Sequence, residues 1–479
     1  MGESRLGSRP FSFNGSIEVK AVDENVSSDA GALLMRELME RCGLVQWLAE
    51  HLIDDRRRGS VAHSVGSLLR TFLLLIVQGH TDQDDADRLR RDPSLRTSAR
   101  DTRGCRDEGG LASQPTLSRF LGILSREENL EVLQQGILKN AVRRLRQAFG
   151  RGKGGSTTPN WVTVDIDDVP LLVHGEQPGS GYNSYVGHEC YHAVVSVCGE
   201  SGDILGARLR NPVQDRAQET HDLALEAADA LLEAFPGSRV LVRMDAGFAS
   251  GGTFDTFEEL NIDFLARIRN NPVLNRMAEP HLERPGDLAA DEVRTVFHEA
   301  TYRAANWSRA RRVVLVVIHR DRELFPRHFW LITSLSRQAF DTEALLKRYR
   351  VRGKAEKTFG ELKTGLNPQL SSSARPKSHF RGRPLERETE PAAEEWRPQN
   401  EAILLLNLLA FQLMHEGRCG METAEGQGWS IGKFREQVLR AGCRVAWHAR
   451  TMTFHIAQSV AVYWWKLLEV WKRSILQMA

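Results

Sequence analysis

Four polar residues in the C-terminal half of the chain have the types and the spacing to act on a phosphate-bearing substrate. Taken as one α-helix of about 3.6 residues per turn, the segment 349–363 places Tyr349, Arg352, Glu356 and Lys363 on one narrow stripe. Glutamate can hold a divalent cation, whereas arginine and lysine bind phosphate groups. Chemistry on a polyanion is one interpretation of this helix, and an amphipathic surface helix with solvated charges is the other.

Two strand-like segments carry further acids. Trp161–Val169 alternates as a strand does, with Asp165 and Asp167 on the same face. Arg239–Met244 is predicted to be another strand, and Asp245 follows it at the carboxyl end, which is a common position for a ligand of metal or phosphate. The alternative for Asp245 is an ordinary cap at the start of the next helix.

The elements that must position these acids follow one another in a defined order. From about residue 161 to 268 the patterns predict three strands, a helix, a strand, a helix and a strand; a further block of strands then precedes the Glu356 helix. In this order an RNase H-like fold brings its carboxylates together. Oxygen ligands from three sites can hold two Mg²⁺ or Mn²⁺ ions ~3.5 to 4 Å apart for in-line phosphoryl transfer. We therefore expect an α/β protein with an RNase H-like catalytic core.

Length and composition divide the rest of the chain around this core. A chain of 479 residues is expected to form about three domains, and stretches rich in Gly, Ser, Thr or Pro mark the boundaries. The predicted segments are an N-terminal helical DNA-binding region (1–155), the first part of the core (156–269), a β-rich insertion (270–334), the Glu-bearing helix of the core (335–370), a flexible linker (371–399) and a C-terminal helical region (400–479).

Two residues outside the core are candidates for DNA contact. Trp307 precedes a basic cluster in the predicted insertion, so its ring is expected either to stack on a base or to pack inside the protein. Arg119 lies on a predicted helix that follows Ser113 and Pro115, in a pattern similar to a helix-turn-helix.

The overall charge does not by itself indicate a nucleic-acid-binding protein. Lys and Arg total 64 against 62 for Asp and Glu, although basic residues cluster locally. Six scattered cysteines without a CxxC pair suit a reducing compartment. The longest apolar run, Thr71–Val77, is far shorter than the ~20 residues of a membrane span, and the start lacks an apolar signal core. We expect a cytoplasmic protein without a membrane partner.

Several ordered motifs together resemble the DDE transposases of bacterial insertion sequences. The spacing of the four residues on the 349–363 stripe matches the Y-R-E-K signature of these enzymes. More narrowly, DIDD with HGEQ (165–168 and 174–177), RMDAGF (243–248) and YRVRGKAE (349–356) resemble the group numbered thirteen-eighty. The resemblance extends over about residues 31–415.

This resemblance implies an enzyme that binds the terminal inverted repeats of its element, cuts there and joins the 3′-ends to target DNA. Excision would pass through a DNA hairpin, and the protein would act as a homodimer on double-stranded DNA. By resemblance Asp245 and Glu356 are the second and third acids, and Asp167 is the first. Asp165 is either the alternative first ligand or a supporting group.

The same resemblance gives the Tyr, Arg and Lys of the signature the task of holding DNA phosphates near the cleavage point. Two other functions use related features. A nuclease on the same fold would use the same acids and cut without joining, and an inactive transposase-derived DNA-binding protein would need none of them. The presence of all the acids disfavours the inactive protein, whereas the long basic N-terminal region favours a transposase over a plain nuclease.

Overall fold

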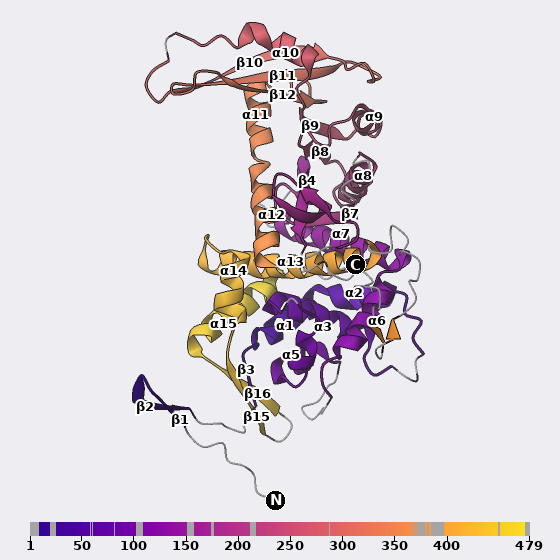
Figure 1. Cartoon of the computed structure of the whole chain (residues 1–479), viewed down its shortest axis with the longest axis vertical. Helices are drawn as coiled ribbons and strands as arrows, with labels where there is room; N and C mark the ends of the chain where they lie inside the picture. The colour runs from indigo at the N-terminus through magenta and orange to yellow at the C-terminus, as the bar shows by residue number, and fades with distance from the viewer. Residues whose placement is uncertain are drawn as a thin grey trace, which may run out of the picture.

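The computed structural model consists of a large mixed β-sheet with helices packed against it and a helical body at one end of the sheet (Figure 1). It describes residues 9–19, 25–57, 59, 61–80, 82–101, 109–150, 158–173, 177–210, 217–286, 288–366, 368, 370, 379–380, 383–384, 397–448 and 451–474. The predicted linker 371–399 therefore lies largely outside the described residues, as do residues 174–176 of the HGEQ motif. In this described part, no helix is both long and apolar enough to cross a membrane.

The N-terminal region begins with short strands and continues as a group of helices. A hairpin of β1 (Arg9–Phe11) and β2 (Asn14–Val19) precedes the short strand β3 (Val26–Ser27). The helices are α1 (Gly31–Cys42), α2 (Leu44–His51), α3 (Val65–Gln78), α4 (Asp85–Arg88), α5 (Pro93–Ala99), α6 (Gln114–Leu124) and α7 (Glu127–Phe149).

Helix α3 forms because local signals define both of its ends. At its start the Ser64 hydroxyl accepts a hydrogen bond from the Ser67 amide. It ends at Gly79, whose φ of 93° is left-handed and costs a glycine little. The helix between these ends is almost entirely buried.

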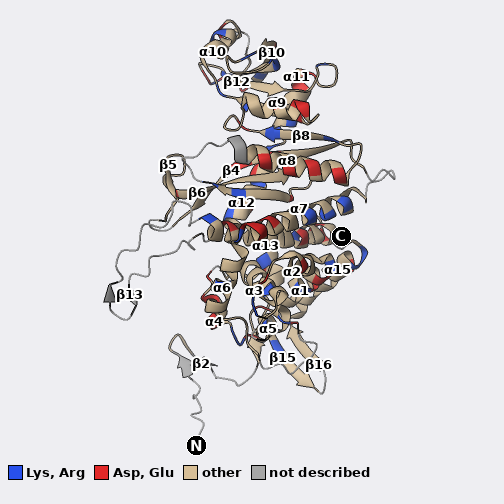
Figure 2. Cartoon of the chain, turned by 90° about the vertical axis from the view of Figure 1, so that its right-hand side faces the viewer, with Lys and Arg blue, Asp and Glu red and all other residues tan. Residues whose placement is uncertain are grey.

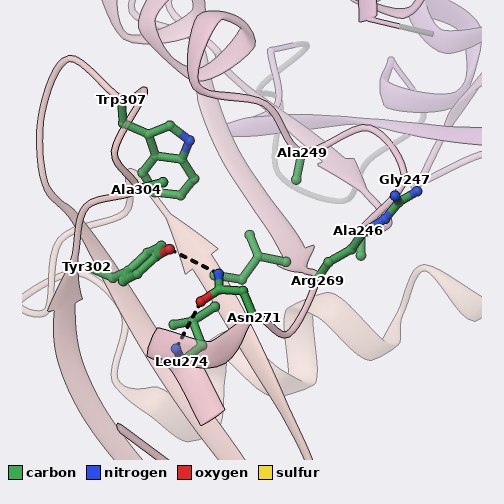
Figure 3. Close-up of a pocket in the computed structure, with 10 residues that line it drawn as sticks. Ala246, Gly247, Ala249, Arg269, Asn271, Leu274, Tyr302, Ala304 and Trp307 are labelled. Carbon is green, nitrogen blue, oxygen red and sulfur yellow. Dashed lines mark hydrogen bonds between the residues drawn. The ribbon is translucent and has the colours of Figure 1, made fainter. Parts of the chain in front are cut away.

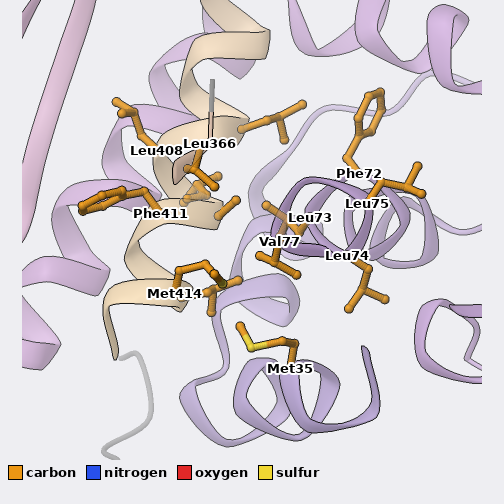
Figure 4. Packing of buried hydrophobic residues seen from close by; sticks show 14 of the residues in the cluster. Met35, Phe72, Leu73, Leu74, Leu75, Val77, Leu366, Leu408, Phe411 and Met414 are labelled. Atoms are coloured by element: carbon orange, nitrogen blue, oxygen red, sulfur yellow. The ribbon is translucent and has the colours of Figure 1, made fainter. Parts of the chain in front are cut away.

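The helical body is held together by α13 (Arg397–Glu425), which crosses it from the C-terminal side. Met414 of α13, Leu73 and Val77 of α3 and Met35 of α1 belong to one buried cluster (Figure 4). Because α13 buries side chains around most of its circumference, the N-terminal and C-terminal regions share a single core.

The sequence predicted a helical C-terminal region, but this region also contains two strands. After α13 come α14 (Ile431–Phe434) and a π-helical turn, and then a hairpin of β15 (Cys443–His448) and β16 (Thr451–Ile456) before α15 (Gln458–Ser474). Strand β15 also pairs with β3 near the other end of the chain. The alternation of exposed and buried residues in β15 is typical of strands, and the hairpin interrupts the predicted C-terminal helical region (400–479).

The central sheet has nine strands within the described residues, in the order β10-β11-β12-β9-β8-β4-β6-β5, with β7 also paired to β6. The strands are β4 (Trp161–Leu172), β5 (Gly181–Asn183), β6 (His188–Cys198), β7 (Ile204–Arg210), β8 (Arg239–Met244), β9 (Asp263–Ile268), β10 (Val293–Tyr302), β11 (Arg311–Arg320) and β12 (Arg327–Thr333). The helices that accompany it are α8 (Ala217–Ala234), α9 (Gly251–Glu259), α10 (Pro272–Ala278), α11 (Thr342–Arg350) and α12 (Gly353–Gly365).

The chain enters this sheet in the predicted order of elements except that the short strand β5 adds a fourth strand before α8. The α/β expectation is confirmed. Strand β4 pairs antiparallel with β6 and parallel with β8, and β8 pairs parallel with β9. The strands expected in the insertion do not form a sheet of their own. They extend the same sheet, because β12 pairs with β9 and β11 and β10 follow outward.

The two faces of β4 have different tasks. Val162, Val164 and Ile166 pack into the cluster that includes α8, whereas the alternate positions hold Asp165 and Asp167. On that second face α11 and α12 follow one another as a column beside the sheet, ending at the helical body (Figure 1). The acids of β4 therefore face the helices that carry the remaining candidate residues.

Candidate active site

Two of the predicted acids lie side by side on neighbouring parallel strands, Asp167 within β4 and Asp245 directly after the carboxyl end of β8. The register of β4 and β8 pairs Asp165 with Arg243 and Ile166 with Met244. The residues that follow on the two strands are Asp167 and Asp245. Residues far apart in the sequence therefore bring their carboxylates to one edge of the site.

Asp165 is enclosed by an arginine. Its side chain is buried, and its two oxygens each accept a hydrogen bond of 2.7 Å from Arg243. The remaining guanidinium nitrogen of Arg243 donates to the backbone carbonyl of Arg348 near the end of α11. Burial raises the pKa of the Asp165 carboxyl, and Arg243 opposes this rise. With both oxygens in use, Asp165 links β4 to β8 and α11.

Asp167 is the more accessible of the two aspartates on this face of β4. Its side chain is 21% exposed, one oxygen accepts from the Asp168 amide at 3.0 Å, and the other lies 2.9 Å from the Arg352 guanidinium. Burial raises the pKa of Asp167, Arg352 opposes the rise and Asp245 adds to it. Asp167 and Asp245 are thus close enough to repel each other, which favours a cation between them.

The segment 349–363 is not one continuous helix, and that prediction is wrong. Helix α11 ends at Arg350 and α12 begins at Gly353. Across the break the Arg352 amide bonds to the Tyr349 carbonyl and the Ala355 amide to the Arg352 carbonyl, each three residues back. A glycine at the junction weakens the helix, and the break turns Arg352 toward the Ile166 carbonyl and Asp167.

The signature residues still surround the two aspartates despite this break. Arg352 is 9% exposed. Burial acts to lower its pKa, but Asp167, Tyr349 and the nearby acids have the larger effect, so the pKa is raised above its ordinary value. Burial raises the pKa of the Tyr349 phenol, and Asp245 adds to this, so the hydroxyl keeps its proton.

Lys363 and Glu356 complete the surroundings from α12. Burial lowers the pKa of Lys363, while Asp167 and Asp168 raise it, so this ammonium group lies within electrostatic reach of both acids. The Glu356 carboxylate is 67% exposed and lies 3.9 Å from Arg352. As an exposed side chain it is free to change rotamer.

The donor set fits a divalent cation in kind. Carboxylate oxygens are the ligands that Mg²⁺ and Mn²⁺ prefer, and Asp167, Asp245 and Glu356 supply them from three elements. Across the described ranges no three Asp, Glu, His or Cys side chains converge tightly enough to hold an ion. Instead, Arg352 is the cation that lies next to Asp167 and nearest to Glu356.

A second charged group lies beside the site, and sequence reasoning did not find it. Asp168, on the opposite face of β4 from Asp167, lies 2.7 Å from His192 of β6 and 2.7 Å from Arg210 of β7. These partners hold the pKa of Asp168 below its usual range although burial acts to raise it. The signal for this group, and for Arg243, was a charged residue within an otherwise apolar strand, which needs an opposite charge on a neighbouring strand.

Trp307 is packed inside the protein and does not present a free ring. Its side chain is 9% exposed, with edge-on contacts to Phe254 and Tyr302. It forms one wall of a cavity of about 210 Å³ that is also lined by Ala246 and Gly247, directly after Asp245 (Figure 3). Of the two alternatives for Trp307, packing is therefore the one observed.

Arg119 is exposed on α6, in the helical body. It is thus separated from the acids, and the site described above does not include it.

The family comparison decides what kind of protein carries this site. The family model "Transposase DDE domain group 1" matches residues 9–380, which is most of the chain. The chain belongs to this family of DDE transposases. DDE transposases are metal-dependent enzymes, and the carboxylates above are in keeping with that activity.

One solved structure similar to this DDE transposase is a cryo-EM structure of the piggyBac transposase synaptic complex with hairpin DNA. The sequence identity is 11% and the TM-score is 0.39, with 94% of this chain and 84% of that chain covered. No curated protein sequence gives a significant match.

Proposed function

We propose that this transposase binds the terminal inverted repeats of a bacterial insertion sequence of the thirteen-eighty group, cuts the DNA there and joins the 3′-ends to target DNA. The observation that carries the proposal is the meeting of Asp167 and Asp245 on neighbouring strands, with Arg352 beside them. The order β7-β6-β4-β8-β9, with β4 and β8 parallel, supports an RNase H-like core in which β10–β12 are the insertion.

Asp167, Asp245 and Glu356 would hold the two Mg²⁺ or Mn²⁺ ions. When bound, such ions activate a water or a 3′-hydroxyl and stabilise the leaving oxygen. Asp165 would support the site through Arg243 rather than bind metal, because both of its oxygens are already used. The bond from Arg243 to Arg348 then sets where α11 ends and Arg352 begins its turn toward β4.

The DNA would approach from the α12 side. Arg352 and Lys363 are cations within reach of the acids, and the Tyr349 hydroxyl can donate to a phosphate oxygen. The opposite approach is unfavourable, because acidic side chains follow one another along α8 (Figure 2). Arg119 would contact the repeat from the helical body.

The cavity beside Asp245 suits an unstacked base near the cut. Its volume of about 210 Å³ and its aromatic wall of Tyr302 and Trp307 suit one planar group, and Asn271 supplies polar atoms. A hairpin intermediate would need such a place, because a tight DNA turn leaves a base unpaired. In this role Trp307 acts from its packed position.

The test uses the DNA that flanks the reading frame. Labelled duplexes of the left and right flanks, incubated with the purified protein and Mg²⁺, are expected to yield hairpin ends and, with a target plasmid, joined products. Asp167→Asn should bind the same duplexes without cutting. Cutting without joining would favour the nuclease, and failure to bind either flank more tightly than a scrambled duplex would refute the proposal.

The number of protein copies can be read from the same reaction. One active site per DNA end predicts a homodimer that holds both ends. Sizing of the protein with two ends bound should therefore give two chains per pair of ends, and a single chain bound to both ends would refute the dimer.

A further inference from the structure

A buried charged network joins the helical body to the sheet. Arg143 and Arg144 of α7 both lie next to the Glu416 carboxylate of α13, and Arg144 also pairs with Asp203 in the turn between β6 and β7. All four side chains are at most 8% exposed. A buried network of this kind is stable only when every charge and polar atom has a partner. A buried polar atom without a partner therefore marks a place where a small molecule could bind.

Cys419 of α13 lies at the open edge of this network. His415 is one helical turn earlier, and its Nε2 atom lies 3.8 Å from the Cys419 sulfur. Guanidinium nitrogens of Arg144 and Arg418 lie 3.7 and 3.8 Å from the same sulfur. Three nitrogen groups from two helices therefore surround one thiol.

The ring of His415 has a defined orientation. Its Nδ1 atom lies 2.8 Å from an Arg418 guanidinium nitrogen, which can only donate, so Nδ1 is the acceptor. Nε2 then carries the hydrogen and donates to the Ser201 carbonyl at 3.1 Å. His415 is thereby held as a neutral imidazole, and the positive charge nearest to the sulfur comes from Arg144 and Arg418.

A cavity of about 230 Å³ opens beside Cys419 and is lined by two polar groups that lack partners. Trp471 of α15 is 2% exposed and Glu416 is 3% exposed. The indole N–H of Trp471 and one carboxylate oxygen of Glu416 have no hydrogen-bond partner within the described part of the chain. One donor and one acceptor, both more than nine-tenths buried, thus line a space that a small polar molecule can enter.

We propose that Cys419 is a reactive thiolate that takes hydroperoxides and small electrophiles through this cavity, which makes it a redox modification site separate from the DNA-cleaving site. Burial alone would raise the pKa of the Cys419 thiol, but the hydrogen bond from the His415 Nε2–H and the charges of Arg144 and Arg418 lower it. Four carboxylates also face the group. Asp203 and Glu416 are balanced by Arg144 and Arg143. Glu422 and Glu361 lie 2.9 and 4.0 Å from Arg418. By contrast, burial raises the pKa of the Cys42 thiol to about 11.

The reaction with a hydroperoxide balances without another partner. The thiolate attacks one peroxide oxygen, so that an S–O bond forms and the O–O bond breaks. The sulfur loses two electrons to become a sulfenic acid, and the leaving oxygen takes a proton from water. The Trp471 N–H is available to hydrogen-bond the peroxide while it reacts.

Two measurements on the full-length protein test this proposal. The first is the rate of iodoacetamide labelling of each cysteine, followed by peptide mass spectrometry from pH 6 to 10. We expect Cys419 to react at least ~10-fold faster than Cys42 and Cys198 at pH 7, with half of its maximal rate near pH 7. A rate no greater than that of Cys198, or one that rises only above about pH 8.5 as for an ordinary thiol, would overturn the proposal.

The second measurement uses hydrogen peroxide followed by dimedone, which traps sulfenic acid. The trapped adduct is expected on Cys419 in the wild type and absent in Cys419→Ser. Arg418→Gln removes one of the surrounding cations and should move the pH of half-maximal iodoacetamide labelling upward. Arg473→Gln, at an exposed position of α15, should leave this pH unchanged. An unchanged midpoint in Arg418→Gln, in a protein with wild-type circular dichroism, would contradict the electrostatic basis.

Discussion

The Arg352 guanidinium lies 2.9 Å from the Asp167 carboxylate, and it reaches this acid from the break between α11 and α12. The contact joins the start of α12, the helix that carries Glu356, to β4, the first strand of the core. Because both groups are largely buried, their interaction is screened by salt less than a surface pair would be. The break in the helix thus places Arg352 beside Asp167.

Replacing Arg352 should weaken the hold on DNA at the cleavage point. Arg352→Ala is expected to bind the flanking duplexes less tightly, with the loss largest at low salt and smaller at high salt, because the slope of log affinity against log salt falls in magnitude by about 1. Arg352→Lys keeps the charge without the planar fork and should lie between the two. Fluorescence anisotropy over a salt series measures both, and Arg473→Ala is the control. Wild-type affinity of Arg352→Ala at every salt concentration would exclude a phosphate contact.

Replacing Glu356 should separate binding from cutting. Glu356→Gln is expected to keep its affinity for the flanking duplexes and to lose Mg²⁺-dependent cleavage by more than about 100-fold. Replacing a residue that only supports a metal ligand already lowers metal affinity or activity by about 10- to 100-fold. Gel assays of cleavage and binding test this side by side. Glu343→Gln, an exposed acid on α11, serves as the matched control. Robust cutting by Glu356→Gln would remove this residue from the mechanism.

The two aspartates of β4 should respond differently to the same substitution. Asp165→Asn leaves Arg243 buried without its partner and should lower the free energy of unfolding by about 3–5 kcal/mol. Asp167→Asn should lower it by less than Asp165→Asn does, since Asp167 is 21% exposed and Arg352 keeps the Glu356 carboxylate 3.9 Å away, while cleavage is abolished. Urea unfolding and cleavage assays distinguish them. An active Asp167→Asn together with a stable, inactive Asp165→Asn would reverse the two roles.

The stability of the buried pair between Asp203 and Arg144 should depend on pH. Burial acts to raise the pKa of Asp203, but the charge of Arg144 and its hydrogen bond outweigh burial and hold the pKa below the ordinary 3.8. The charged carboxylate therefore stabilises the fold fully above about pH 3.8 and loses this contribution as the pH falls through the folded-state pKa.

Asp203→Asn is accordingly expected to cost about 3–5 kcal/mol at pH 7. The difference from the wild type should shrink as the pH falls from about 3.8 through the lower folded-state pKa, below which both proteins carry an uncharged side chain. Urea unfolding at pH 7, 5 and 3 measures this difference. A gap between the two proteins that stays constant with pH would mean that the charge of Asp203 contributes nothing.

The order of elements and the candidate acids could be predicted from the sequence because both depend on local pattern. The period of two in β4 put Asp165 and Asp167 on one face, and the apolar strand before Asp245 placed that residue at a carboxyl end. The family resemblance came from motifs that are each continuous in the chain. Each of these features depends on only a few residues that are neighbours in the sequence.

What only the tertiary structure decided are contacts between distant residues. Arg243 lies 78 residues after Asp165 and takes both of its oxygens, and local periodicity contains no information on that pairing. The bend at Arg352 depends on a strand it meets only after folding. Strand β15 finds β3 across almost the whole chain. The sequence by itself thus determined which chemistry is possible, whereas packing decided which carboxylate is enclosed and which remains accessible.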